Sequence, residues 1–339
     1  MKDRQGRWDM FDDYVVDFAC DRAARSIRTA IVTLVEIEGS SPLRVGAQMA
    51  VAETGEWVGY LSGGCIERAI AAEACAAIRS GAPRRVRYGR GSPYMDIRLP
   101  CGGAIELVID VGISASELQR IDAAFHCRMP CAMEIPDAGG PLVEGGRTGP
   151  FRRLCLPRRQ LVVAGIGPVT VQLARQARSG GFDVIVASSD EITREAAAVD
   201  EIESRAIGRA AGERLLGIDA RSAVVLAFHD HEWETGLLPE ILRSDAFYIG
   251  AMGSRRTHAL RVMRLKADGF DDAAIARIRA PAGILPGVRG ATGIAASIYA
   301  EILQGDALAT GDLLMPLQPE RRSPGKSMTG IMPSGAHPG

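Results

Sequence analysis

The chain has 339 residues, which exceeds the usual size of one folding domain and predicts two domains. Hydrophobic residues make up 47% and charged residues 24%, a composition typical of globular proteins with packed cores and unlike that of disordered chains. Forty basic residues nearly balance forty-one acidic ones, so the net charge of -1 gives no general attraction for nucleic acid or an anionic membrane. Any anion site must therefore be local.

The amino-terminal segment MKDRQGRWDMFDD is charged and lacks the apolar stretch of a signal peptide. No apolar run approaches the ~18 residues needed to cross a bilayer. Seven cysteines in a long chain of this kind favour free thiols over a disulfide framework. We expect a cytoplasmic protein that binds neither a membrane nor nucleic acid.

The first half of the chain predicts a mixed α/β domain over residues 10–150. Helices are predicted at Met10–Arg25 and Ile66–Arg79, the second ended by Gly81 and Pro83. Runs rich in β-branched residues or bounded by turn residues predict strands at Thr29–Ile37, Gln48–Ala52, Glu56–Leu61, Arg84–Tyr88 and Ala104–Val111. Residues 134–159 are rich in Pro, Gly and Arg with weak periodicity, which puts a domain boundary near Pro157.

Beyond this boundary, strands alternate with helices over residues 158–305, which is typical of a Rossmann-like, doubly wound parallel sheet. The predicted strands are Leu161–Ala164, Asp183–Ala187, Ala223–Phe228 and Phe247–Ile249. The predicted helices are Val169–Ser179, Ile192–Ala198, one capped by Ser254 that runs through Lys266, and one capped by Thr292 that runs through Leu303. Residues 316–339 are rich in Pro, Gly and Arg and are predicted to form a disordered tail.

A glycine-rich turn joins the first strand and helix of this half in the sequence LVVAGIGPVT. Gly165, Gly167, Pro168 and Val169 lie where backbone N–H groups and the helix dipole attract a phosphate. Asp190 follows the next strand, at the position of a ribose-binding acid. The motif fits a phosphorylated cofactor, NAD(P) among the candidates. Glycines that serve only packing in a βα turn are the alternative.

Two further segments follow strands of the same predicted sheet. His229 and His231 lie in the segment Phe-His-Asp-His, where imidazoles can ligate a metal, move protons or contact phosphate, or simply form local hydrogen bonds. The segment YIGAMGSRR repeats the plan of strand, glycine turn and capped helix with two arginines added. It predicts a second anion site, with a solvated arginine pair as the alternative, at Gly250, Gly253, Ser254 and Arg255.

Two loops of the first half place a cysteine beside paired glycines, in SGGCIE and LPCGG. The candidate residues are Gly63, Gly64, Cys65, Glu67, Cys101 and Gly102. Bare backbone leaves such thiols accessible, and a helix beginning after Cys65 favours its thiolate, the form that binds soft metals or carries sulfur. A structural role is the alternative. Cys20, Cys75 and Cys155 are expected to be buried or incidental, and the Cys127 to Cys131 spacing does not predict a zinc site.

In chain order, SSPLRVGAQM, LSGGCIE and CGG, followed by GIGPV, HDH, YIGAMGSRR and AASIYAEI, resemble the XdhC/CoxI family over residues 15–305. The resemblance implies a maturation factor rather than an enzyme. Such a factor binds molybdenum cofactor, as molybdopterin or its cytosine dinucleotide form, and supports its sulfuration with a cysteine desulfurase. It then delivers the cofactor to the large subunit of an apo molybdenum hydroxylase of the xanthine dehydrogenase or carbon monoxide dehydrogenase type. Pro168 and Glu234 depart from the family pattern.

The resemblance assigns the two kinds of motif to the two ends of this cofactor. The glycine turns suit its phosphate, and the thiols of Cys65 and Cys101 suit its molybdenum, so we expect a homodimer whose subunits hold the cofactor between their two domains. Two alternatives stay open: an NAD(P)-dependent oxidoreductase that uses Gly165, Gly167 and Asp190, and a sulfur-handling enzyme with Cys65 or Cys101 as persulfide carrier.

Overall fold

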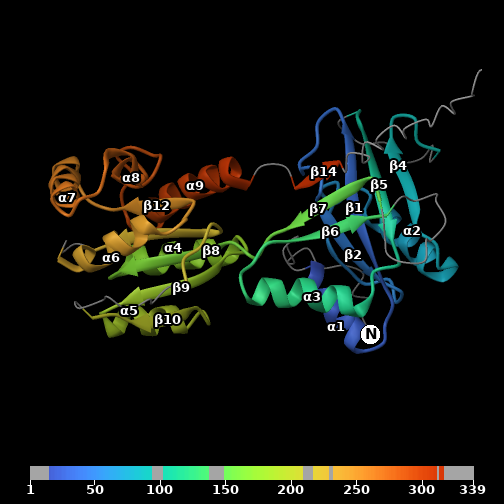
Figure 1. The fold of residues 1–339 in the computed structure, drawn as a ribbon, viewed down its shortest axis with the longest axis horizontal. Helices are drawn as coiled ribbons and strands as arrows, with labels where there is room; N and C mark the ends of the chain where they lie inside the picture. Colours follow the sequence, from blue (N-terminus) through green and yellow to red (C-terminus); the bar gives the residue numbers. More distant parts are fainter. Residues whose placement is uncertain are drawn as a thin grey trace, which may run out of the picture.

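The structure is a computed structural model that describes residues 15–93, 102–136, 149–208, 217–228, 232–310 and 313–316. Figure 1 shows two α/β units arranged along the longest axis, with the amino-terminal unit on the right and the Rossmann-like unit on the left. The predicted fold class is confirmed. Within the described ranges, no helix is both long enough and apolar enough to span a membrane.

The amino-terminal unit is built on a five-stranded antiparallel sheet in the order β3-β2-β1-β5-β4. Its strands are β1 (Thr29–Glu38), β2 (Gln48–Ala52), β3 (Trp57–Gly59), β4 (Arg84–Gly89) and β5 (Ala104–Asp110). Its helices are α1 (Val15–Ala24), α2 (Glu67–Ser80) and α3 (Ala115–His126). Each strand of this sheet, α1 and α2 are predicted from the sequence, although residues 10–14 of the first helix lie outside the described part.

Alternating burial along the central strands creates two apolar faces. On one face Ile70 and Ala74 of α2 pack against Val32 and Leu107. On the other face α1 and α3 pack against the opposite side chains of β1 and β2. The left-handed conformation of Gly81, with φ of 67°, ends α2 as predicted. The sheet is therefore covered on both sides.

A small three-stranded antiparallel sheet in the order β14-β7-β6, which we call the connecting sheet, packs on the amino-terminal unit and leads into the Rossmann unit. It consists of β6 (Cys131–Ile135), β7 (Phe151–Cys155) and β14 (Leu314–Pro316). The sequence analysis missed these strands because they are short and rich in charged residues or fall where Pro and Gly mask the period. Only the fold shows that the end of the chain returns to pair with β7, far from it in sequence.

The Rossmann unit contains a six-stranded parallel sheet in the order β10-β9-β8-β11-β12-β13. Its strands are β8 (Gln160–Gly165), β9 (Asp183–Ser188), β10 (Glu203–Ala206), β11 (Ser222–Ala227), β12 (Tyr248–Ala251) and β13 (Ile278–Arg279). Its helices are α4 (Pro168–Ser179), α5 (Glu191–Ala198), α6 (Glu232–Arg243), α7 (Arg255–Ala267), α8 (Asp272–Ala276) and α9 (Ala291–Thr310). The order reverses between β8 and β11, which is the ligand-binding switch point of such sheets.

Helices cover both faces of the parallel sheet. Apolar residues of α4, α5 and α9 pack on one face, and those of α6, α7 and α8 pack on the other. The last helix departs from the prediction, because it begins at Ala291 and runs to Thr310. Thr292 is therefore inside α9 instead of capping it. The extra turns carry the chain back toward the amino-terminal unit (Figure 1).

The amino ends of the parallel strands face the amino-terminal unit. Arg128, just after α3, donates to both carboxylate oxygens of Asp219 at 2.5 and 3.1 Å, ahead of β11. Arg158, just before β8, pairs with Asp17 of α1, and its carbonyl accepts a hydrogen bond from Arg128. We call Asp17, Arg128, Arg158 and Asp219 the arginine clamp. It holds the two units together at this edge of the sheet.

A second set of charges fixes the carboxyl end of α9 to the same edge. Asp306 pairs with Arg221 at 3.0 Å and with Arg159 at 3.4 Å, and Thr310 donates a further hydrogen bond to it. The Asp306 and Arg221 side chains are 15% and 13% exposed. Water screens such a pair weakly, so Asp306 organises this corner.

We expect Asp306→Ala to lower the free energy of unfolding by about 1–3 kcal/mol, because it leaves two partly buried guanidinium groups without their carboxylate. Asp272→Ala is the matched control, since Asp272 pairs with Lys266 at 2.8 Å on the surface. That variant should lose less than about 0.5 kcal/mol. Urea unfolding followed by circular dichroism measures both, and equal losses would contradict the role given to Asp306.

Candidate functional site

Three loops of the amino-terminal unit converge through close glycine contacts. A Cβ on Gly39 would lie 3.3 Å from the Cα of Gly103, and one on Gly103 would lie 2.2 Å from the carbonyl oxygen of Glu38. A Cβ on Gly63 would lie 3.7 Å from Pro42. The structure thus brings together the loop at residues 39–42, the SGGC loop at residues 62–65, and the glycines that follow Cys101.

Cys65 is exposed at the surface of this group of loops. Gly63 and Gly64 precede it with φ of 82° and 105°, a backbone region that favours glycine. Gly102 is also exposed, with φ of 67°. The thiol lies directly before Ile66, the N-cap residue of α2. The loop therefore presents an accessible sulfur on bare backbone, as predicted for residues of this type.

Glu67 differs from the prediction that it contacts a ligand. Its side chain is buried, and its carboxylate accepts hydrogen bonds from the backbone N–H groups of Leu61 and Ser62 at 3.0 and 2.7 Å. The Ser62 hydroxyl and the Ile66 N–H also lie within hydrogen-bond distance of it. Both oxygens are used inside the protein, so Glu67 shapes the SGGC loop and acts as a positioning residue.

Burial alone would raise the pKa of the Glu67 carboxyl, but the hydrogen bonds from Ser62 and Leu61 hold this pKa below its usual value. A carboxyl whose pKa is lower in the folded state stabilises the fold above its unfolded pKa. That stabilisation is lost as the pH falls through the folded pKa.

We expect Glu67→Gln to reduce the free energy of unfolding at pH 7 by about 1–3 kcal/mol, because an amide cannot accept all of these hydrogen bonds. The difference from the wild type should shrink as the pH falls below about 4. Glu191→Gln, at an exposed position in the first turn of α5, is the control. Unfolding curves measured between pH 3 and 7 test this, and a difference that stays constant over that range would argue against the assignment.

The second group of predicted residues lies at the carboxyl edge of the parallel sheet, at the switch point after β8. Gly165 is buried, and a Cβ there would lie 2.6 Å from the carbonyl oxygen of Ala227. Gly165 therefore serves strand packing, and its contact with a ligand stays a prediction. Gly167 has φ of 87° with no atom within 4 Å of a Cβ position. It leaves open space at the start of α4, where Pro168 is exposed and Val169 half-buried.

Asp190, predicted to contact a ribose, has a structural task. It is the N-cap residue of α5, and its carboxylate accepts hydrogen bonds from the N–H and the hydroxyl of Thr193 at 2.8 and 2.5 Å. These bonds hold the pKa of Asp190 below its usual value. The Thr193 hydroxyl in turn accepts the Gly167 N–H at 2.9 Å. Groups that a dinucleotide would use are thus engaged within the protein.

The third turn precedes α7. Gly250 is buried, and a Cβ there would lie 2.7 Å from the Tyr248 ring, so it too serves packing. Gly253 is exposed with φ of 127°, and Ser254 caps α7 as predicted by accepting the Thr257 N–H at 3.1 Å. Arg255 follows on the surface. The first turn of α7 holds no acidic residue, although helix N-termini favour them, so an anion is well suited to this position.

The sequence analysis missed Arg261, which lies in α7 and is buried. It pairs with Glu234 of α6 at 2.7 Å, with side-chain exposures of 4% and 3%, and donates to the Met252 carbonyl. Its Nη1 atom is buried without a hydrogen-bond partner in the described structure. Both residues line a cavity of about 200 Å³ between α6 and α7. The spacing of Thr257, Arg261 and Leu265 on one helical face was the available signal.

Within one chain the two groups do not share a cleft. The SGGC loop leads into α2 in the right half of Figure 1, whereas α7, which follows the Gly253 turn, lies at the left end. The expectation that one subunit holds both cofactor ends between its domains is therefore wrong for this arrangement. Three predicted residues, Cys101, His229 and His231, lie outside the described residues.

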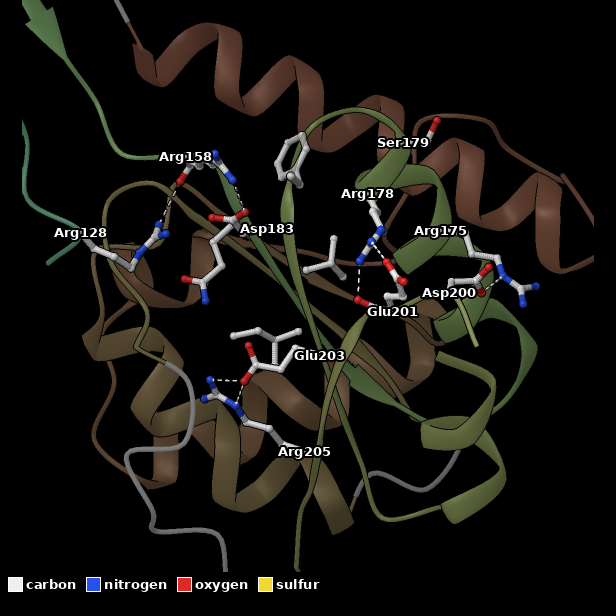
Figure 2. Close-up of a pocket in the computed structure, with 14 residues that line it drawn as sticks. Arg128, Arg158, Arg175, Arg178, Ser179, Asp183, Asp200, Glu201, Glu203 and Arg205 are labelled. Carbon is white, nitrogen blue, oxygen red and sulfur yellow. Dashed lines mark hydrogen bonds and ion pairs between the residues drawn. The ribbon is translucent and has the colours of Figure 1, made fainter. Parts of the chain in front are cut away.

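A different cavity, of about 970 Å³, lies beside the amino ends of β9 and β10 and the carboxyl end of α4, with Arg128 and Arg158 on its rim. Figure 2 shows that its charged side chains pair with one another. Arg175 pairs with Asp200 at 2.5 Å and Arg205 with Glu203 at 2.7 Å. An anion here would have to displace existing carboxylates. No group of three or more metal-ligating side chains occurs among the residues that the structure describes.

The fold and these sites define a two-part α/β protein with a phosphate-type turn in one part and an accessible thiol in the other. Residues 23–89 match the family model described as the XdhC and CoxI family, and residues 161–302 match the XdhC Rossmann domain. The chain belongs to the XdhC/CoxI family, as the motifs predicted.

Named relatives agree with this assignment. The chain is 34% identical over 300 residues to the molybdenum cofactor insertion chaperone PaoD of Escherichia coli K12, covering 86% of this chain and 88% of that protein. It is 25% identical over 323 residues to a probable xanthine dehydrogenase subunit from Bacillus subtilis, covering 81% and 92%. A crystal structure described as a xanthine dehydrogenase from Bacillus halodurans shares the fold, with a TM-score of 0.70 at 21% identity and coverage of 93% and 98%.

Proposed function

We propose that this protein is a cytoplasmic chaperone that binds molybdenum cofactor and passes it to an apo molybdenum hydroxylase. The observation that carries the proposal is the open carboxyl edge of the parallel sheet, where Gly167 leaves room for a ligand and α7 begins with exposed arginines. The similarity to PaoD, whose name states cofactor insertion, supports the identity of the cargo. A binding and transfer role requires no catalytic residue.

The chemistry of this edge fits the phosphate of the cofactor, in either its molybdopterin or its dinucleotide form. Backbone N–H groups at the starts of α4 and α7 attract negative charge, and neither helix has an acidic residue in its first turn. Arg255 can add a charge-assisted hydrogen bond. Asp190, the predicted ribose contact, is engaged as the N-cap of α5 and offers less to NAD(P), so that alternative has weaker support.

Cys65 fits the other end of the cofactor. A thiolate is a soft ligand for molybdenum and a competent sulfur acceptor, and this thiol is exposed on a glycine loop. The same accessibility suits sulfuration with a cysteine desulfurase, in which Cys65 protects the metal end or receives sulfur. Glu67 supports both tasks, because its buried carboxylate accepts hydrogen bonds from the backbone of the SGGC loop.

We expect the protein purified from a host that makes molybdenum cofactor to retain this cofactor. Arg255→Ala or Cys65→Ser should lower the retained amount about tenfold or more, because each variant loses one charge-assisted contact with the cofactor. Arg25→Ala, on the exposed surface after α1, and Cys127→Ser, at another exposed thiol, are the controls. Molybdenum analysis and fluorescence of the oxidised pterin measure retention. An empty wild-type protein, or equal losses in the controls, would overturn the proposal.

The SGGC loop and the carboxyl edge of the parallel sheet form two distant half-sites in one chain. A homodimer can bring them together, because the SGGC loop of one copy can meet the sheet edge of another. Cys65→Ser chains and Arg255→Ala chains should then each fail alone. Their co-expressed mixture should recover about a quarter of wild-type retention, since half of the dimers hold one intact site of two. The mass in solution should be twice the chain mass of 36.1 kDa. A monomer, or a mixture without recovery, would contradict this arrangement.

A further inference from the structure

Two cysteines face each other on the connecting sheet, away from both half-sites. Cys131, the first residue of β6, is directly opposite Cys155, the last residue of β7, in the antiparallel register. Both are free cysteines in the structure. Directly opposite residues have Cα atoms roughly 4.5–5.5 Å apart. A disulfide requires roughly 4.4–6.8 Å, so the backbone is already placed for one.

The surroundings favour thiolate chemistry over metal binding. Nη1 of Arg153 lies 3.4 Å from the sulfur of Cys155 and would repel a cation. The hydrogen bond from Cys131, helped by the Arg153 charge, holds the pKa of Cys155 at about 6 against the opposing effect of burial. The same hydrogen bond and partial burial raise the pKa of Cys131. Near neutral pH these directions favour a thiolate at Cys155 beside a protonated Cys131.

Exposure assigns different roles to the two sulfurs. Cys155 is 0% exposed, so a reagent in solution cannot reach it. Cys131 is half-buried and accessible from one side. An oxidant must therefore meet Cys131 first, and Cys155 can act only afterwards, from inside the sheet.

We propose that Cys131 and Cys155 form a reversible thiol–disulfide site whose co-substrate is a low-molecular-weight disulfide. The Cys155 thiolate accepts the proton of Cys131 as the Cys131 sulfur attacks the small disulfide, which releases one small thiolate. Cys155 then gives its proton to that thiolate and attacks the Cys131 sulfur, which releases the second small thiolate to be protonated by solvent. One protein thiol and one protein thiolate are oxidised to the bridge, and the small disulfide, with one further proton from solvent, is reduced to two thiols.

The position of the cysteine pair means that a disulfide between Cys131 and Cys155 would restrain the contact between the two units. Cys131 lies three residues after Arg128, and Cys155 lies three residues before Arg158. These two arginines belong to the arginine clamp, and Arg128 donates directly to the Arg158 carbonyl at 3.2 Å. A bridge would tie together the two chain segments that hold the units against each other, at the point where β7 leads into β8.

The test exposes the full-length protein to buffers of graded reduced and oxidised glutathione, followed by alkylation and peptide mass spectrometry. The wild type should form a Cys131–Cys155 linked peptide pair that dithiothreitol reverses, with an upward shift of the unfolding midpoint when the bridge is present. Cys155→Ser should instead accumulate glutathione on Cys131. Cys131→Ser should form neither the bridge nor an adduct at Cys155.

Cys127→Ser is the matched control, because Cys127 is an exposed thiol close in sequence to Cys131. It should bridge as the wild type does. The proposal fails if Cys131 and Cys155 remain separately alkylated across the series while the exposed Cys65 and Cys127 take up glutathione. It also fails if the linked pair appears only in denaturant. The wild-type result decides the matter even if a serine variant does not fold.

Discussion

The contact between the arginine clamp and the amino edge of the parallel sheet determines how the rest of this molecule can work. The two edges of such a sheet differ in charge, because helix N-termini lie at the carboxyl edge and helix C-termini at the amino edge. Arg128 and Arg158 come from outside the sheet and approach the edge that favours cations. The amino-terminal unit thereby covers one edge and leaves the anion-attracting edge open, with Gly167 and the start of α7 accessible.

The motif residues divide by burial into those that shape the loops and those that are accessible to a ligand. Glu67, Gly165 and Gly250 are buried and fix the backbone, and Asp190 caps a helix. Cys65, Gly167 and Arg255 are accessible in the same loops. A sequence motif therefore indicates a backbone conformation as well as residues that can contact a ligand. In the SGGC loop one buried carboxylate organises the backbone that presents the thiol, so loop shape and ligand chemistry depend on each other.

The connecting sheet joins the two units through two chain segments instead of one flexible linker. β7 leads into β8, and after α9 the chain returns as β14 to pair with β7. Arg153 adds a buried hydrogen bond to the Gly46 carbonyl at 2.7 Å, next to the loop at residues 39–42. Two chain crossings and a charged interface restrain the angle between the units. A thiol pair at the end of this sheet is well placed to make that restraint sensitive to the surrounding redox state.

Local pattern was enough to predict the parallel sheet, the β2–β3 hairpin, the Gly81 end of α2 and the Ser254 cap, because short-range backbone chemistry decides these features. Family membership also followed from the order of the motifs. The sequence did not reveal β14, the Arg261–Glu234 pair or the Cys131–Cys155 pair, since each joins residues from different elements. It also suggested one cleft, whereas the structure places the SGGC loop and the turn before α7 in different units (Figure 1). Tertiary packing decided that separation, because the edge at which two units dock depends on complementary charges that no single segment carries.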